Sequence, residues 1–282
     1  MKIEHLIATM KVNSIEQNEK LINEMKIKCS SVTISQVGEN KLFNVERSYN
    51  IEEENCIDDK RENVLALSNK VGLSNSRNDA LKYSGADICI VSDDDVIYED
   101  KYLDLIKKAY ENNSDADIIV FDIINENVER KTSKIHNKNI NWINAMKVSS
   151  NQITFKRKSI IENKLDFDIN FGSGGKYFLG EDTIFIYDAL KKGLKIVYNN
   201  NVILKMPKSK SSWFKKYDEM YFRSLGACYY RISKKFYKLL IFQFALRKYN
   251  KYKNDINIIN AIKQMKNGVK DYNKLLKKLD IN

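Results

Sequence analysis

The sequence predicts an α/β protein: a mostly parallel sheet flanked by helices, with a basic, helical C-terminal extension. Three observations support this prediction. Strand-like and helical segments alternate over the first two thirds of the 282 residues. Residues 88–91, Ile-Cys-Ile-Val, are apolar without a break, as in a parallel strand covered on both faces. Beyond Met206 the segments become helical, basic and aromatic, so we expect two domains, residues 1–204 and 205–282.

The first part of the chain opens with a β-α-β pattern, which predicts parallel strands joined by a right-handed crossover. Residues 37–62 are polar and without a clear period, which indicates a long loop with room for one edge strand. Ser74 and Ser76 are expected to cap the next helix. In order, the expected elements are strands at 3–10 and 30–36, a helix around 15–27, a helix at 74–84 and the buried strand at 88–91.

The middle of the chain continues the alternation. The apolar run at 116–124 predicts an interior strand, and a Gly-rich loop at 171–182 precedes a helix that Gly193 ends. On that helix Ile184, Tyr187, Ala189 and Leu190 are expected to share one face. The remaining expected elements are a helix at 99–112, a strand-to-helix passage near 151, and two short strands at 194–199 and 201–206.

Three consecutive aspartates, Asp93, Asp94 and Asp95, follow the strand predicted at 88–91. Ligands of open α/β sheets bind at the carboxyl ends of the strands, and adjacent carboxylates repel one another unless a cation or solvent offsets their charge. The triplet therefore indicates a metal site. An acidic, solvated turn before the next helix is the alternative interpretation.

The cysteines predict neither a disulfide framework nor a zinc site, because Cys29, Cys56, Cys89 and Cys228 are far apart and form no CxxC pair. The first residues do not read as a signal peptide, and no stretch approaches the ~20 apolar residues of a spanning helix. We therefore expect a cytoplasmic protein.

The net charge of +11 is concentrated at the C-terminal end. Residues 205–282 hold 20 Lys and Arg against 5 Asp and Glu, a net of +15, whereas residues 1–204 hold 28 against 32. Such asymmetry predicts a polyanionic partner for the C-terminal region, either an anionic membrane surface or a nucleic acid.

Three motifs occur in a fixed order: "GLSNSRNDAL" at 72–81, "DICIVSDDDV" at 87–96 and "GEDTIFIYDALKKGLKIVYN" at 180–199. Together they resemble the GT-A (Rossmann-like) glycosyltransferases of family 2, inverting enzymes that use nucleotide-activated sugars. The resemblance covers about residues 1–204. It implies a nucleotide-sugar donor, a glycan or lipid-linked glycan acceptor in surface polysaccharide synthesis, and a Mn²⁺ or Mg²⁺ cofactor.

The resemblance also implies roles for individual residues. Asp94 would bind the divalent cation, with Asp95 as a further ligand or a water-holding group. Oxygen ligands of this kind suit Mg²⁺ and Mn²⁺, which usually take one or two carboxylates together with phosphate oxygens. For Arg77, a salt bridge on the protein surface is the alternative interpretation. The implied nucleotide-sugar-binding residues are Thr9, Arg77, Asn78, Asp93 and Asp95.

Asp182 is the implied catalytic base, with Glu181 as acceptor ligand or second choice. Direct displacement at the anomeric carbon needs a carboxylate that takes the proton of the acceptor hydroxyl, and a carboxylate of pKa ~4 is ionised at neutral pH. The loop at 172–175 is expected to admit the acceptor. Acidic residues at a helix start are also favoured by the helix dipole alone, which is the alternative interpretation.

The sequence departs from the family at three places. Ser92 stands where many relatives begin the aspartate motif, so the roles of Asp93 and Asp94 could shift by one residue. Gln36 stands where relatives often carry an acidic residue that reads the uracil base, which leaves the base open. The two histidines, His5 and His136, do not follow the Glu-Asp pair, and His5 is expected to be a core histidine.

Two other classes of function fit the sequence less well. A phosphatase of the haloacid dehalogenase kind also places aspartates at a strand end, but the threonine of its pattern would fall at Ile97. A non-catalytic nucleotide-sugar-binding or membrane-binding module would not need both Asp94 and Asp182. For the C-terminal region, peripheral binding to the inner face of the cell membrane competes with a helical cap packed on the protein. Nucleic acid is not an expected partner, because no recognised nucleic-acid-reading motif accompanies the charge. The expected interfacial aromatics are Trp213, Tyr217, Phe222, Tyr229, Tyr230, Phe236 and Phe242.

Overall fold

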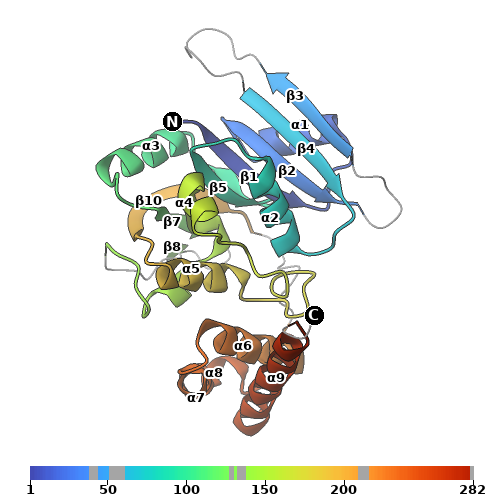
Figure 1. The fold of residues 1–282 in the computed structure, drawn as a ribbon, viewed down its shortest axis with the longest axis vertical. Helices are drawn as coiled ribbons and strands as arrows, with labels where there is room; N and C mark the ends of the chain where they lie inside the picture. The colour runs from blue at the N-terminus through green and yellow to red at the C-terminus, as the bar shows by residue number, and fades with distance from the viewer. Residues whose placement is uncertain (38–43, 51–60, 127–129, 132–137, 209–215, 280–282) are drawn as a thin grey trace. The chain divides into compact units, whose positions relative to one another are not determined.

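The computed structural model describes residues 1–37, 44–50, 61–126, 130–131, 138–208 and 216–279 (Figure 1). Cys56, His136 and Trp213 lie outside these residues. The chain forms two compact units, each made of several segments of the sequence. The predicted division into domains 1–204 and 205–282 stays a prediction. The first unit comprises Met1–Val71, Asn75–Asp166 and Phe185–Ser209, and the second comprises Gly72–Ser74, Phe167–Ile184 and Lys210–Asn282.

The first unit contains a ten-stranded mixed sheet, in the order β3-β4-β2-β1-β5-β9-β7-β10-β6, with β8 beside β7. Strands β4, β2, β1, β5, β7 and β10 run in one direction, which confirms the predicted mostly parallel sheet. The strands are β1 (Ile3–Thr9), β2 (Ser30–Gln36), β3 (Asn44–Asn50), β4 (Arg61–Ser68), β5 (Ile88–Asp93), β6 (Ile97–Tyr98), β7 (Ile118–Asn125), β8 (Arg130–Lys131), β9 (Ile153–Lys156) and β10 (Ile196–Met206).

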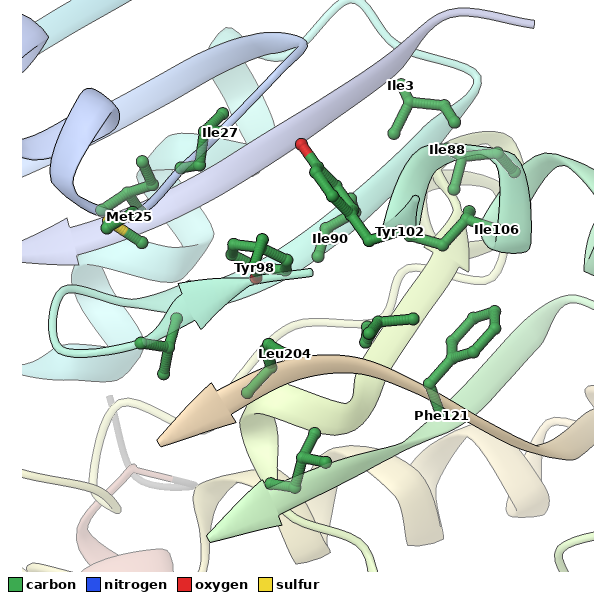
Figure 2. Packing of buried hydrophobic residues seen from close by; sticks show 14 of the residues in the cluster. Ile3, Met25, Ile27, Ile88, Ile90, Tyr98, Tyr102, Ile106, Phe121 and Leu204 are labelled. Carbon is green, nitrogen blue, oxygen red and sulfur yellow. The ribbon is translucent and has the colours of Figure 1, made fainter. Parts of the chain in front are cut away.

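Helices connect these strands, and two of them cover a large core. The helices are α1 (Ile15–Glu24), α2 (Leu73–Tyr83), α3 (Tyr102–Asn112), α4 (Arg157–Glu162) and α5 (Glu181–Lys191); α2 and α5 contain residues of both units. Side chains of α1 and α3 pack with those of β1, β5, β7 and β10 in one cluster. Figure 2 shows part of this cluster, with Tyr102 and Ile106 of α3 beside strand residues such as Ile88. All seven residues of β1 are buried, as expected for a strand covered on both faces.

The core beneath the aspartates contains a polar network around His5, which confirms the expected core histidine. His5 is fully buried; its Nδ1 lies 2.8 Å from Ser92 Oγ and its Nε2 lies 2.9 Å from the hydroxyl of Tyr102. Ser92 Oγ also lies 2.8 Å from the hydroxyl of Tyr98. Tyr98 and Tyr102 are seen among the apolar side chains in Figure 2. The network therefore joins β1, β5, β6 and α3 next to the strand end that carries Asp93.

The second unit packs four C-terminal helices with the loop at 167–180. These helices are α6 (Glu219–Ile232), α7 (Tyr237–Arg247), α8 (Tyr249–Tyr252) and α9 (Ile258–Leu279), drawn in orange to red in Figure 1. Gly226 of α6 and Gly268 of α9 bring the two helices into backbone contact, since a Cβ on either would lie about 2 Å from a carbonyl oxygen of the other helix. The predicted helical nature of the C-terminal region is confirmed.

Three sequence predictions were wrong in detail. The predicted loop at 37–62 includes Arg61 and Glu62, the first two residues of β4, and no strand is predicted at 63–68, because the apolar run Val-Leu-Ala-Leu is short. The two strands expected at 194–206 are one strand, β10, whose register against β7 is irregular at Val202. Ser74 and Ser76 are not caps, because α2 begins at Leu73: Ser74 donates a hydrogen bond to the carbonyl of Phe171, and Ser76 accepts one from Gln36.

Candidate functional site

Asp93, at the carboxyl end of β5, is held on both carboxylate oxygens. Its Oδ1 lies 2.8 Å from Arg77 Nη2, and its Oδ2 accepts hydrogen bonds from Asn151 Nδ2 at 2.9 Å and Ser150 Oγ at 3.3 Å. The backbone N–H of Asp93 donates to Asn151 Oδ1 at 2.9 Å. Arg77 is only 1 % exposed, so the alternative of a surface salt bridge is wrong. The buried charge of Arg77 is therefore paired, as a buried charge must be.

Asp94 binds the end of β1, the strand beside β5. Its Oδ2 accepts a hydrogen bond of 2.5 Å from the hydroxyl of Thr9, and its Oδ1 lies 2.8 Å from Lys11 Nζ. The Lys11 ammonium also reaches the carbonyl of Asp94 at 3.2 Å. The structure thus brings Thr9, predicted as a site residue, together with Asp94, and it adds a cation that the sequence analysis missed.

Asp95, the third aspartate of the triplet, is exposed. Partial shielding of its carboxyl from solvent, followed by the charges of Asp93 and Asp94, raises the pKa of Asp95. A cation placed at this carboxylate would remove the repulsion. Among the described residues no group of three or more His, Cys, Asp or Glu side chains converges as a ready-made metal site. The donor set fits a cation that takes one or two carboxylates here and its other ligands from a phosphate or water.

The remaining predicted binding residue, Asn78, follows Arg77 on α2 and is half-buried. The contacts that assemble the cluster come instead from Ser150 and Asn151, which begin a 3-10 turn just before β9. The only feature of the sequence that could have indicated Ser150 and Asn151 as site residues is the polar run "SSNQ" before a predicted strand. Polar runs of this kind are usual in turns and do not identify a partner. Gln36, at the end of β2, donates a hydrogen bond of 3.1 Å to Ser76 of α2.

Glu181 and Asp182 begin α5 in the second unit, at the end of the Gly-rich loop. Glu181 is buried and packs against Gly172, whose φ of +95° disfavours other residues and whose Cβ, if present, would lie 3.1 Å from the Glu181 carboxyl carbon. Asp182 is half-buried, and its Oδ1 accepts a hydrogen bond of 2.7 Å from the backbone N–H of Thr183. Such a contact is expected if Asp182 is favoured at this position only because it begins a helix. The catalytic role of Asp182 is therefore a proposal.

The Gly-rich loop is folded into hydrogen-bonded turns and anchored to the C-terminal helices. Asp168, at its start, accepts hydrogen bonds from Arg231 Nε of α6 at 2.8 Å and from the hydroxyl of Tyr272 of α9 at 3.2 Å. At its end Gly180, with φ +105°, lies against Cys228 of α6 so closely that a Cβ would fall 2.6 Å from the sulfur. The C-terminal helices therefore support the segment that carries Glu181 and Asp182.

The chain has the GT-A fold: the fragment 1–349 of S. aureus TarS, solved with UDP-GlcNAc, matches 96 % of this chain and 80 % of its own length, with 13 % identity and a TM-score of 0.64. The same fragment solved with UDP matches 95 % and 81 % of the two chains, with 13 % identity and a TM-score of 0.61. At such low identity the likeness establishes the fold.

Residues 45–179, which include the first two motifs, match the sequence model of the family described as Glycosyl transferase family 2. The predicted resemblance to the GT-A glycosyltransferases of family 2 is therefore confirmed. A search of curated proteins finds no match. Family and fold together support a transferase of glycosyl groups.

Proposed function

We propose that the protein is an inverting glycosyltransferase that acts in surface polysaccharide synthesis. It would move a sugar from a nucleoside diphosphate to an acceptor that is a glycan or a lipid-linked glycan. The observation that carries the proposal is the cluster at the carboxyl ends of β1 and β5, where Thr9, Lys11 and Arg77 hold Asp93 and Asp94 in place. A UDP-sugar is the first donor to test, because TarS was solved with UDP-GlcNAc and with UDP.

Each residue of the cluster has a task in donor binding. Asp93, fixed by Arg77 and Asn151, presents a rigid carboxylate at the position where the ribose and sugar hydroxyls would bind. Lys11 supplies a positive charge suited to a phosphate, and its ammonium would exchange Asp94 for the diphosphate. Fixing these groups before the donor arrives reduces the entropy lost on binding.

Asp94 and Asp95 would hold Mn²⁺ or Mg²⁺, with Asp95 as the carboxylate that gains most from the added charge. The cation, when bound, would neutralise negative charge on the departing diphosphate. Because Lys11 and Thr9 already occupy the oxygens of Asp94, the cation competes with Lys11 there and not at Asp95.

Asp182 is proposed as the general base, with Glu181 as the residue that orients the acceptor. The acceptor hydroxyl would attack the anomeric carbon while its proton passes to the Asp182 carboxylate. The bond between that carbon and the diphosphate oxygen breaks with its electron pair leaving on the oxygen, so the anomeric configuration inverts. The GT-A fold and the family match make the alternatives of a haloacid dehalogenase phosphatase and a binding module less favoured.

The experiment measures UDP binding by calorimetry with and without Mn²⁺, in the wild type and in Asp95→Asn. We expect Mn²⁺ to strengthen binding at least about tenfold in the wild type and to have little effect in the variant. Asp115→Asn is the matched control, because Asp115 is an exposed aspartate at the opposite, amino end of β7.

Two results would count against the proposal. Equal binding of UDP with and without Mn²⁺ in the wild type would remove the metal assignment. No binding of any nucleoside diphosphate or nucleotide sugar in a panel covering the common bases, by a protein whose fold is intact by circular dichroism, would overturn the donor site itself.

A further inference from the structure

Helix α7 is apolar on two opposite sides. Its inner side packs within the second unit: Ile241 is 2 % exposed and Ala245 is 0 % exposed. A helix that is hydrophobic all round is normally buried, in a protein core or in lipid. The other side of α7 is nevertheless exposed, with Leu239 (65 %), Phe242 (56 %) and Leu246 (62 %). Phe236 (54 %), at the N-cap of α7, and Tyr249 (38 %), the first residue of α8, are exposed as well, and we call these five residues together the α7 outer face.

The spacing of these residues shows that they form one surface. Within α7, Leu239, Phe242 and Leu246 follow one another at intervals of three and four positions, which places them on one side of a helix with 3.6 residues per turn. Phe236 and Tyr249 stand three positions before and after this row in the sequence. Single exposed apolar residues are normal on protein surfaces, but a contiguous row of large ones indicates a binding surface. Among the polar residues of α7, Lys238, Gln243 and Arg247 are exposed as well.

The charge around the α7 outer face has one sign. Between Met220 and Asn254 the chain carries nine Lys and Arg and no Asp or Glu. Lys235, Lys238, Arg247 and Lys251 are exposed, at the beginning and at the end of the row of apolar residues. The Lys235 ammonium lies 5.4 Å from the centre of the Phe236 ring, so a cation and an aromatic ring are presented together.

We propose that the α7 outer face is a membrane-docking surface that inserts shallowly into the headgroup region of an anionic bilayer. The apolar side chains would enter the boundary of the acyl chains, and the flanking lysines and arginines would contact the anionic headgroups. Within the described residues no helix has the length and hydropathy to cross a bilayer, so the contact is with one surface. The proposal does not depend on the glycosyltransferase reaction.

The structure narrows the earlier expectation about the aromatic residues of the C-terminal region. Phe222 and Tyr229 are buried, at 0 % and 3 % exposure, and help to form the interior of the second unit. Tyr230 donates a hydrogen bond to Asn273 of α9 at 3.1 Å and is half-buried. Much of the region therefore packs as a helical unit, and of the predicted interfacial aromatics that the structure describes, Phe236 and Phe242 are exposed and belong to the α7 outer face.

The test is co-sedimentation with vesicles, without any nucleotide sugar. We expect the wild type to bind vesicles containing phosphatidylglycerol at low salt, and to bind pure phosphatidylcholine weakly. Leu239→Asn combined with Phe242→Asn should reduce binding to anionic vesicles at least about tenfold, because two large apolar groups no longer enter the bilayer. Both positions are exposed, so the fold should be retained, which circular dichroism would check.

A matched pair of charge variants separates docking by this face from general attraction to the cationic surface. Lys235→Glu with Lys238→Glu changes the charge beside the α7 outer face, whereas Lys266→Glu with Lys270→Glu makes the same change on exposed positions of α9. We expect the first pair to weaken vesicle binding at least about threefold more than the second. Phe242→Trp adds an insertion probe, whose indole fluorescence should be quenched by brominated lipid in anionic vesicles.

Three outcomes would overturn the proposal. Wild-type protein that stays in the supernatant with anionic vesicles, or indole fluorescence of the Phe242→Trp variant that brominated lipid does not quench, means that the face does not enter lipid. Equal loss of binding in the two charge pairs, with no loss in the Leu239 and Phe242 double variant, means that attraction is diffuse. A dimer in analytical ultracentrifugation that the double variant dissociates, without vesicle binding, means that a second copy covers the face. Retained UDP binding in all variants keeps these results separate from the donor site.

Discussion

The guanidinium of Arg77 lies 2.8 Å from the Asp93 carboxylate, with the arginine side chain 1 % exposed and the aspartate 31 % exposed. The ion pair joins α2 to the carboxyl end of β5, where the aspartate triplet begins. A buried arginine is costly unless its charge is compensated, so this pair makes the position of Asp93 and the burial of Arg77 depend on each other.

Replacement of Arg77 should therefore affect stability more than replacement of an ordinary surface arginine. We expect Arg77→Gln to lower the free energy of unfolding by about 1–3 kcal/mol, less than for a fully buried pair because Asp93 is partly solvated. Arg47, paired with Glu62 at 49 % and 23 % exposure, is the control, and Arg47→Gln should cost at most about 1 kcal/mol. Urea unfolding of both variants measures the difference, and equal losses would show that the Arg77 pair is not special.

The buried imidazole of His5 should make stability depend on pH. Burial, and next the positive charge of Arg61, lower the pKa of His5 to about 3. Its neighbours Ser92, Tyr98 and Tyr102 are neutral at these pH values. The unfolded chain binds a proton at this imidazole near pH 6.5, whereas the folded chain does so only near pH 3. Stability from this group is therefore full above pH 6.5 and is lost as the pH falls through the window from 6.5 to 3.

Urea unfolding at about pH 4.5, 5.5, 6.5 and 7.5 measures this effect. We expect His5 to contribute a slope of up to about 1.4 kcal/mol per pH unit below about pH 6.5, and His5→Gln to remove that part of the slope. Tyr98→Phe should lower stability at every pH while keeping most of the slope, because the imidazole remains. A His5→Gln protein with the same slope as the wild type would show that other groups cause the acid sensitivity.

The sequence allowed the sheet and the position of the aspartates to be predicted, because a long apolar run and a charged triplet are local signals. The partners of the aspartates could not be predicted in the same way. Ser150 and Asn151 lie 57 and 58 positions from Asp93, and a polar side chain in a turn carries no information about its distant partner. The composition of the C-terminal region also did not predict which of its helices is buried. Both α6, which is mostly interior, and the α7 outer face mix aromatic and basic residues.

The close approach of α6 and α9 should tolerate no side chain at its two glycines. A Cβ on Gly226 would lie 2.0 Å from the carbonyl oxygen of Met265, and a Cβ on Gly268 would lie 1.9 Å from that of Arg223. Backbone atoms cannot rotate away, so the helices must separate. We expect Gly226→Ala and Gly268→Ala each to lower the free energy of unfolding by about 1–3 kcal/mol or more, despite the better helix propensity of alanine.

Gly85→Ala is the control for these variants, since the nearest atom to a Cβ there is the mobile end of Lys2 at 3.9 Å. It should change stability by less than about 0.5 kcal/mol. Stability gained on substitution at Gly226 or Gly268, as helix propensity alone predicts, would show that the two helices do not touch in solution.

The two acidic residues at the start of α5 should differ in catalysis. We expect Asp182→Asn to retain UDP binding and to lose at least ~100-fold in kcat, the usual contribution of a positioned general base. Glu181 is buried against Gly172, so Glu181→Gln should keep measurable turnover with a raised KM for the acceptor if it orients the acceptor and does not take the proton.

Asp188→Asn, on the same helix and paired with Lys191 at 2.9 Å, is the control for the loss of one charge from α5 and should keep near-normal kcat. Steady-state kinetics of the three variants, once a donor and an acceptor have been identified, gives the comparison. If Glu181→Gln loses activity and Asp182→Asn does not, the proton acceptor is Glu181, and the role of Asp182 is structural, at the start of α5. The anomeric configuration of the product, read by NMR, tests the displacement separately, because retention would contradict a single inverting step.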